Sequence, residues 1–188
     1  MTGTGPLLDR ARIAATVERL GAEIAADHPE GVVLVGVLKG AAILLADLAR
    51  AVRGPEVSVT CMAISRFAPD SGRVRILHDV DLDLTGRDVV LVEDLIDTGL
   101  TATFLVRTLR ERGARRVSVC ALLDRTVRRI VPLEVEYRGV EIDDAFVAGY
   151  GLHVGDRYRN LPDIHVLDRD VLARDPAAYD TLLYGPRG

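Results

Sequence analysis

The chain is poor in cysteine, tryptophan and lysine, and these shortages narrow what it can be. Its 188 residues include no tryptophan and only two cysteines, Cys61 and Cys120. Both cysteines lie in apolar, strand-like stretches, which is typical of buried thiols in a reducing compartment. A metal site would need more ligands than two cysteines provide, so we do not expect one to be built from them.

The sequence also has no basic excess and no long apolar run. The formal net charge is −4, so there is no general basic surface to attract nucleic acid. No apolar run reaches the ~18 residues of a membrane span, and the N-terminus lacks the basic and apolar regions of a secretory signal. We therefore expect a cytoplasmic protein that binds neither nucleic acid nor membranes.

Lysine occurs at a single position. Of the 24 basic residues, 23 are arginines, and Lys39 is the exception. A drift in composition towards arginine would leave a lysine where a compact ammonium group is needed instead of a planar guanidinium. Lys39 is therefore a candidate functional residue, with chance survival as the alternative.

Apolar strand patterns alternate with helical patterns along most of the chain. Asp9 is expected to cap a first helix that ends near His28, and a second helix is predicted over 41–52. Strands are predicted over 32–38, 57–64, 73–77, 116–123 and 133–137. This alternation predicts a single α/β domain over 1–188, with a mainly parallel twisted sheet flanked by helices. Ligands of such sheets bind beyond the carboxyl ends of the strands, where Lys39, Asp94 and Arg125 are expected.

Residues 89–101, which read VVLVEDLIDTGLT, form the most informative stretch. A run suited to a buried strand gives way to a helical pattern, and the unpaired amides and positive dipole at such a helix start favour an anion. The expected phosphate cradle consists of Thr98, Gly99, Leu100 and Thr101. Glu93 and Asp94 suit sugar hydroxyls or a hydrated cation instead. Neither a Walker motif nor a GxGxxG motif occurs.

Three further motifs extend this pattern: VGVLKG at 35–40, ALLDRTVRR at 121–129 and DDAFVAGYGLHVGDRYRNLP at 143–162. In this order and spacing, the four motifs resemble the hypoxanthine-guanine phosphoribosyltransferases, a family of type I purine phosphoribosyltransferases. The resemblance covers residue 10 to about 166. It implies the type I phosphoribosyltransferase fold with a small hood built from the C-terminal segment. It also implies transfer of a phosphoribosyl group from phosphoribosyl pyrophosphate to a purine base.

The resemblance assigns the contacts to phosphoribosyl pyrophosphate. Leu38, Lys39 and Gly40 would bind pyrophosphate, with a cis peptide bond between the first two, and Arg159 would meet the same group. Glu93 and Asp94 would hold the ribose hydroxyls and the associated Mg2+, the expected cofactor, which prefers oxygen ligands.

The resemblance also assigns the catalytic group and the base site. Asp97 would accept the proton of the reacting base as a general acid/base, although a carboxylate here can also serve as a helix cap. Phe146 would stack on the purine, and the backbone of Val147 would read the edge of the base. A plain core role is the alternative for Phe146.

Three positions depart from the family pattern. Arg125 stands where the family has a lysine that donates to the exocyclic oxygen of the purine. His153 stands where the family has an aspartate that helps hold a second magnesium beside the base, and imidazole is a poor ligand for that ion. Ser65 and Arg66 replace a serine-tyrosine pair in a mobile flap, expected over about 65–75.

The phosphoribosyl half of the pattern is thus complete and the base half is altered. We expect a hood over about 125–166, a peripheral tail over 167–188, and a homodimer or homotetramer, as is usual in the family. The predicted activity is salvage of hypoxanthine or guanine. The alternatives are the same reaction on a non-standard base such as a deazapurine, and a non-catalytic regulator that senses phosphoribosyl pyrophosphate.

Overall fold

The computed structural model describes residues 5–65 and 75–185. Its main sheet has six strands in the order β3-β2-β1-β4-β5-β6, and all neighbouring pairs are parallel except β2 and β3. The strands are β1 (Val32–Leu38), β2 (Val57–Ser65), β3 (Arg75–His78), β4 (Asp88–Ile96), β5 (Arg116–Asp124) and β6 (Tyr137–Glu141). The predicted α/β fold with a mainly parallel sheet is confirmed.

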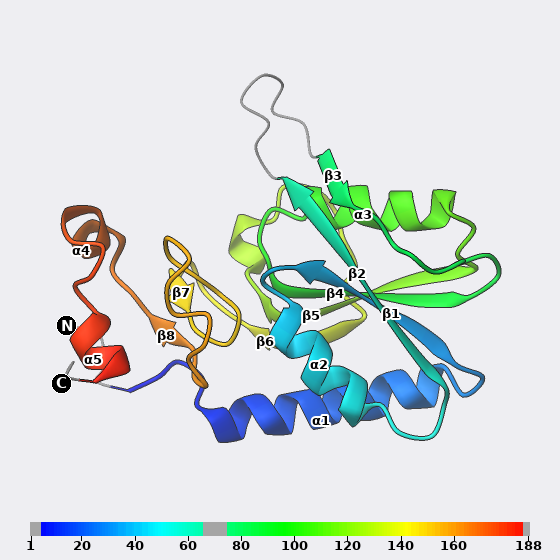
Figure 1. The fold of residues 1–188 in the computed structure, drawn as a ribbon, viewed down its shortest axis with the longest axis horizontal. Helices are drawn as coiled ribbons and strands as arrows, with labels where there is room; N and C mark the ends of the chain where they lie inside the picture. The colour runs from blue at the N-terminus through cyan, green and yellow to red at the C-terminus, as the bar shows by residue number, and fades with distance from the viewer. Residues whose placement is uncertain (1–4, 66–74, 186–188) are drawn as a thin grey trace.

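Helices cover both faces of this sheet (Figure 1). Helices α1 (Arg10–Asp27) and α2 (Ala42–Ala51) lie on one face, and α3 (Leu100–Glu111) lies on the other. Along β1, Val32 and Leu34 pack into the core of the first face, whereas Val33 and Val35 pack into the core of the second. A strand buried on both faces needs apolar residues at every position, which explains the unbroken apolar runs in the sequence.

The first helix begins where the sequence predicts. Asp9 is its N-cap, and the carboxylate of Asp9 accepts a hydrogen bond of 2.8 Å from the Arg12 amide. Ile13, Val17 and Leu20 are buried against the sheet, as their helical spacing indicates. None of the helices in the described part of the chain is both long and apolar enough to span a membrane.

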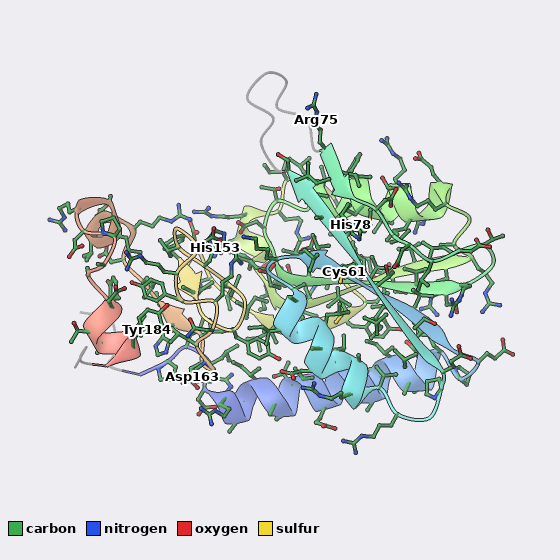
Figure 2. The ribbon with its side chains drawn as sticks, in the orientation of Figure 1. Cys61, Arg75, His78, His153, Asp163 and Tyr184 are labelled. Carbon is green, nitrogen blue, oxygen red and sulfur yellow. The ribbon has the colours of Figure 1, made fainter. Side chains whose placement is uncertain are left out.

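A second small sheet forms the hood. Its strands are β7 (Val147–Ala148) and β8 (His165–Val166), which pair antiparallel. Figure 1 shows the hood on the left, beyond the edge of the main sheet at which β1 ends. The amide of Arg10 donates a 2.6 Å hydrogen bond to Asp163, so the hood is anchored to the start of α1, where Figure 2 labels Asp163.

Two sequence predictions need correction. Residues 133–137 do not form a strand; β6 begins at Tyr137, the last of them, because the apolar side chains before it pack against the α3 face without joining the sheet. The tail is not merely peripheral: its helices α4 (Arg169–Arg174) and α5 (Asp180–Tyr184) pack on the hood. The fully buried Tyr158 donates a 2.8 Å hydrogen bond to Asp180 of the tail.

A buried polar cluster joins α1 to the sheet. The His28 ring lies between Asp88, 3.1 Å from Nδ1, and the Tyr137 hydroxyl, 3.0 Å from Nε2. The same hydroxyl donates a 2.9 Å hydrogen bond to Asp27. Burial, and then the Asp27 carboxylate, raises the pKa of Tyr137. The tyrosine is therefore a neutral hydroxyl that donates its proton to Asp27 and forms a further hydrogen bond with the His28 ring at the end of the helix.

We expect Tyr137→Phe to lower the free energy of unfolding by about 1–2 kcal/mol, because the buried His28 ring loses one of its two partners and the Asp27 carboxylate loses a donor. Urea denaturation followed by circular dichroism measures this change. A midpoint equal to that of the parent protein, with the same slope, would contradict the prediction.

Candidate active site

A cavity of about 830 Å³ lies beyond the carboxyl ends of β1, β4 and β5. Parallel strands bring distant sequence segments together at this edge. The cavity is lined by nearly all of the predicted site residues that the structure describes: Leu38, Lys39, Gly40, Glu93, Asp94, Asp97, Thr98, Gly99, Leu100, Thr101, Arg125, Phe146, Val147, His153 and Arg159.

The predicted phosphate cradle is the start of α3. Gly99 is the N-cap of this helix with a φ of 82°, in the left-handed region that favours glycine. The N-cap glycine has no side chain to cap the helix, the Thr98 hydroxyl accepts a long hydrogen bond of 3.4 Å from the Leu100 amide, and the first turn contains no acidic residue. The first amides of the helix therefore face the cavity with the positive end of the dipole and without a competing carboxylate.

The loop after β1 packs tightly between β4 and the hood. The peptide bond between Leu38 and Lys39 is cis, as the resemblance implies. A Cβ atom on Gly40 would lie 1.9 Å from the Asp94 carboxylate, and one on Gly151 would lie 2.1 Å from the carbonyl oxygen of Gly40. At Gly40 the buried Asp94 carboxylate would have to shift, whereas at Gly151 the obstacle is backbone, so Gly151 requires glycine. The close approach fixes the loop around Gly151 (the hood loop) against the loop that follows β1 (the lysine loop).

Two carboxylates from β4 form the acidic wall of the cavity. Glu93 and Asp94 are both buried and both line it. The Leu95 amide donates a 2.9 Å hydrogen bond to Oδ1 of Asp94. The described residues contain no cluster of three or more metal-ligating side chains. The donor set fits an ion that takes oxygen ligands, such as Mg2+, with most of its shell supplied by substrate oxygens and water.

Asp97, the candidate general base, is held by Arg125, the arginine that stands where the family has a lysine at the base site. Asp97 accepts a 2.6 Å hydrogen bond from Nη1 of Arg125, whose side chain is 2% exposed. Arg125 also donates to the Ala145 carbonyl. Its backbone amide donates to the Ile96 carbonyl at 2.9 Å, which ties the ends of β4 and β5 together. A fixed guanidinium thus orients the Asp97 carboxylate towards the cavity.

A second ionic group involves the cavity residues Lys39, His153 and Arg159. One carboxylate oxygen of Asp156 lies 3.1 Å from Nη2 of Arg159, 3.9 Å from Nζ of Lys39 and 3.9 Å from Nδ1 of His153. Figure 2 shows His153 where the hood meets the sheet. The Arg159 guanidinium, and then the Lys39 ammonium, hold the pKa of Asp156 below its usual range. The two predicted pyrophosphate cations therefore share one intramolecular anion.

A family model described as the phosphoribosyl transferase domain matches residues 4–154, which is most of the chain. The chain belongs to the phosphoribosyltransferase family.

Individual phosphoribosyltransferases agree with this assignment. The chain is 37% identical over 179 residues to hypoxanthine-guanine phosphoribosyltransferase of Bacillus subtilis, covering 93% of this chain and 95% of that protein. It is 42% identical over 172 residues to the enzyme of the same name from Mycobacterium avium, covering 86% and 84%. A crystal structure of a hypoxanthine-guanine phosphoribosyltransferase from Bacillus anthracis is similar with a TM-score of 0.83 at 34% identity, covering 87% and 98%.

The phosphoribosyltransferase motifs did not point to every residue at the site. Gly151, Asp156 and Arg169 contact predicted site residues, although no sequence pattern singled them out. Arg169 lies in the tail, beyond the matched segment. Ser65 ends β2 without lining the cavity, and Arg66 lies outside the described residues, so the predicted role of the flap stays a prediction.

Proposed function

We propose that the chain transfers the 5-phosphoribosyl group of phosphoribosyl pyrophosphate to a 6-oxopurine, hypoxanthine or guanine, and releases pyrophosphate in purine salvage. One observation carries the proposal: a single cavity joins a helix start without a carboxylate, the two cations Lys39 and Arg159, and the aromatic ring of Phe146. These match the three parts of the reaction, namely phosphate, pyrophosphate and base. The related enzymes of Bacillus subtilis and Mycobacterium avium have names that state this activity.

In this reaction the amides around 98–101 hold the 5′-phosphate, and Lys39 and Arg159 hold the pyrophosphate as it leaves. Asp97 takes the proton of the base while the base nitrogen bonds to the anomeric carbon. Positive charge that develops on the ribose is stabilised by the carboxylates of Glu93 and Asp94. Bound Mg2+ would be held by the same two carboxylates and would neutralise charge on the pyrophosphate.

Arg125 keeps the base end suited to an oxopurine. A guanidinium donates hydrogen bonds and accepts none, so it can meet an exocyclic carbonyl but not an amino group. Phe146 and Val147 line the same cavity as Arg125, and Nδ1 of His153, which also lines it, lies 3.9 Å from the Asp156 carboxylate. Assembly as a homodimer or homotetramer is part of the proposal as well.

A base screen tests the proposed activity. Pyrophosphate release is followed with phosphoribosyl pyrophosphate, Mg2+ and one of hypoxanthine, guanine, adenine or 7-deazaguanine. We expect hypoxanthine or guanine to give the highest kcat/KM. Turnover of the deazapurine alone would favour the specialised pathway, and binding of phosphoribosyl pyrophosphate without turnover of any base would favour a sensor.

Substitution of Asp156 should strengthen ligand binding, whereas most active-site substitutions weaken it. Its carboxylate already occupies the space between Lys39 and Arg159. A neutral side chain there would remove the repulsion that incoming pyrophosphate must overcome. We therefore expect Asp156→Asn to tighten the binding of magnesium pyrophosphate about threefold, as measured by isothermal titration calorimetry.

Lys39→Ala is the matched counterpart, since it removes the cation instead of the anion. It should weaken pyrophosphate binding measured in the same way. Weaker binding in Asp156→Asn would mean that the carboxylate organises the site and does not compete with the ligand.

A further inference from the structure

Arg169 is a cavity residue that comes from the C-terminal tail. It is the first residue of α4, and it lines the same cavity as Phe146 and Arg125. Its guanidinium carbon lies 4.7 Å from the centroid of the Phe146 ring. This distance is within the range of a cation–π contact.

The tail holds Arg169 in this position through several contacts. The amide of Leu167 donates a 2.8 Å hydrogen bond to the carbonyl of Phe146. Asp168 caps α4 by accepting hydrogen bonds from the amides of Asp170 and Val171. Leu167 is buried in the hood core against which Phe146 packs. The start of α4 is therefore fixed relative to the aromatic ring.

Arg169 also differs from the nearby arginines Arg125 and Arg128 in that they form ion pairs with carboxylates. Arg125 is paired with Asp97, and Arg128 is paired with Asp144. By contrast, no carboxylate among the described residues lies within 4.0 Å of Arg169, the limit for an ion pair. Its guanidinium lies over the face of Phe146, and its charge acts at longer range on Asp144, whose pKa is lowered by Arg128 first and then by Arg125 and Arg169.

We propose that Arg169 is a recognition residue of the base site, which positions the Phe146 ring and presents donors to the bound base. The inference rests on the proposed function, because it takes Phe146 as the ring on which the base stacks. Arg125 and Arg169 are both donors without acceptor capacity, so this end of the cavity favours a base that carries carbonyl acceptors. A planar guanidinium can stack and donate at the same time.

Ligand binding with and without the base tests this role. Inosine 5′-monophosphate and ribose 5-phosphate are titrated calorimetrically into the parent protein, Arg169→Ala and Arg169→Lys. We expect Arg169→Ala to weaken the nucleotide about fivefold and to leave ribose 5-phosphate unchanged. Arg169→Lys retains the cation and should lose less than Arg169→Ala.

Arg174→Ala is the matched control, because Arg174 ends the same helix and does not line the cavity. It should bind both ligands as the parent does. Unchanged nucleotide affinity in Arg169→Ala, or equal loss for both ligands, would overturn the inference and leave the proposed function standing. Failure of the parent to bind the nucleotide would overturn the proposed function, and the inference with it.

Discussion

Asp97→Asn should lower kcat by about 10²- to 10⁴-fold while phosphoribosyl pyrophosphate still binds. The asparagine cannot take a proton from the base, and general base catalysis contributes acceleration of this order. The phosphate and pyrophosphate contacts that we propose involve other residues, at 98–101, Lys39 and Arg159. Binding of the donor should therefore survive.

Asparagine is the informative replacement because of the Arg125 contact. The guanidinium is buried, and its Nη1 donates to the Asp97 carboxylate at 2.6 Å. An asparagine oxygen can still accept that hydrogen bond, whereas alanine would leave a buried charge without its carboxylate, which is strongly destabilising. A loss of activity in Asp97→Ala would mix the catalytic effect with a structural one.

Pyrophosphate release gives kcat, and calorimetry gives the affinity for phosphoribosyl pyrophosphate. Asp144→Asn is a suitable control, since Asp144 also pairs with an arginine, Arg128, but does not line the cavity. The control should turn over as the parent does. Equal kcat in Asp97→Asn and the parent would remove Asp97 from the catalytic role.

Gly151→Ala should weaken phosphoribosyl pyrophosphate binding at least tenfold and lower the free energy of unfolding by about 1–3 kcal/mol. The added Cβ would lie 2.1 Å from the Gly40 carbonyl, and Gly151 has a φ of 96°. The contact is with backbone, so no side chain can turn away to make room. The lysine loop and the hood loop must separate.

Separation of the loops would also displace Arg159. Its Nη1 donates a 2.6 Å hydrogen bond to the carbonyl of Gly151, and the Gly151 amide donates a 2.9 Å hydrogen bond to the carbonyl of Arg159. Lys39 precedes Gly40 directly. Both cations proposed to hold pyrophosphate would therefore move together, which explains the large expected loss.

Gly155→Ala separates the clash from the backbone strain. Gly155 lies in the same loop with a φ of 54°, and a Cβ there would meet nothing within 4 Å. It should lose some stability and little binding. Calorimetry and urea denaturation measure both variants, and equal binding losses in the two would show that strain, not the Gly40 contact, is responsible.

Local sequence signals were sufficient for the central sheet. The apolar runs of β1, β4 and β5 were visible because a strand covered on both faces has apolar side chains at almost every position. The Asp9 cap was visible because a cap acts within one helical turn. The strand predicted over 133–137 was wrong, because apolar side chains can pack in a core without forming a strand.

The sequence by itself determined where the predicted phosphate cradle and the acidic pair lie and the order of the motifs, because each depends on neighbours within a few residues. Only the tertiary structure decided that Arg125 holds Asp97, that Asp156 lies between Lys39 and Arg159, and that Gly151 touches Gly40. It also brought Arg169 from the tail to Phe146. These contacts join segments that are distant in the chain, so they depend on how the sheet and hood pack, and no local pattern encodes that packing.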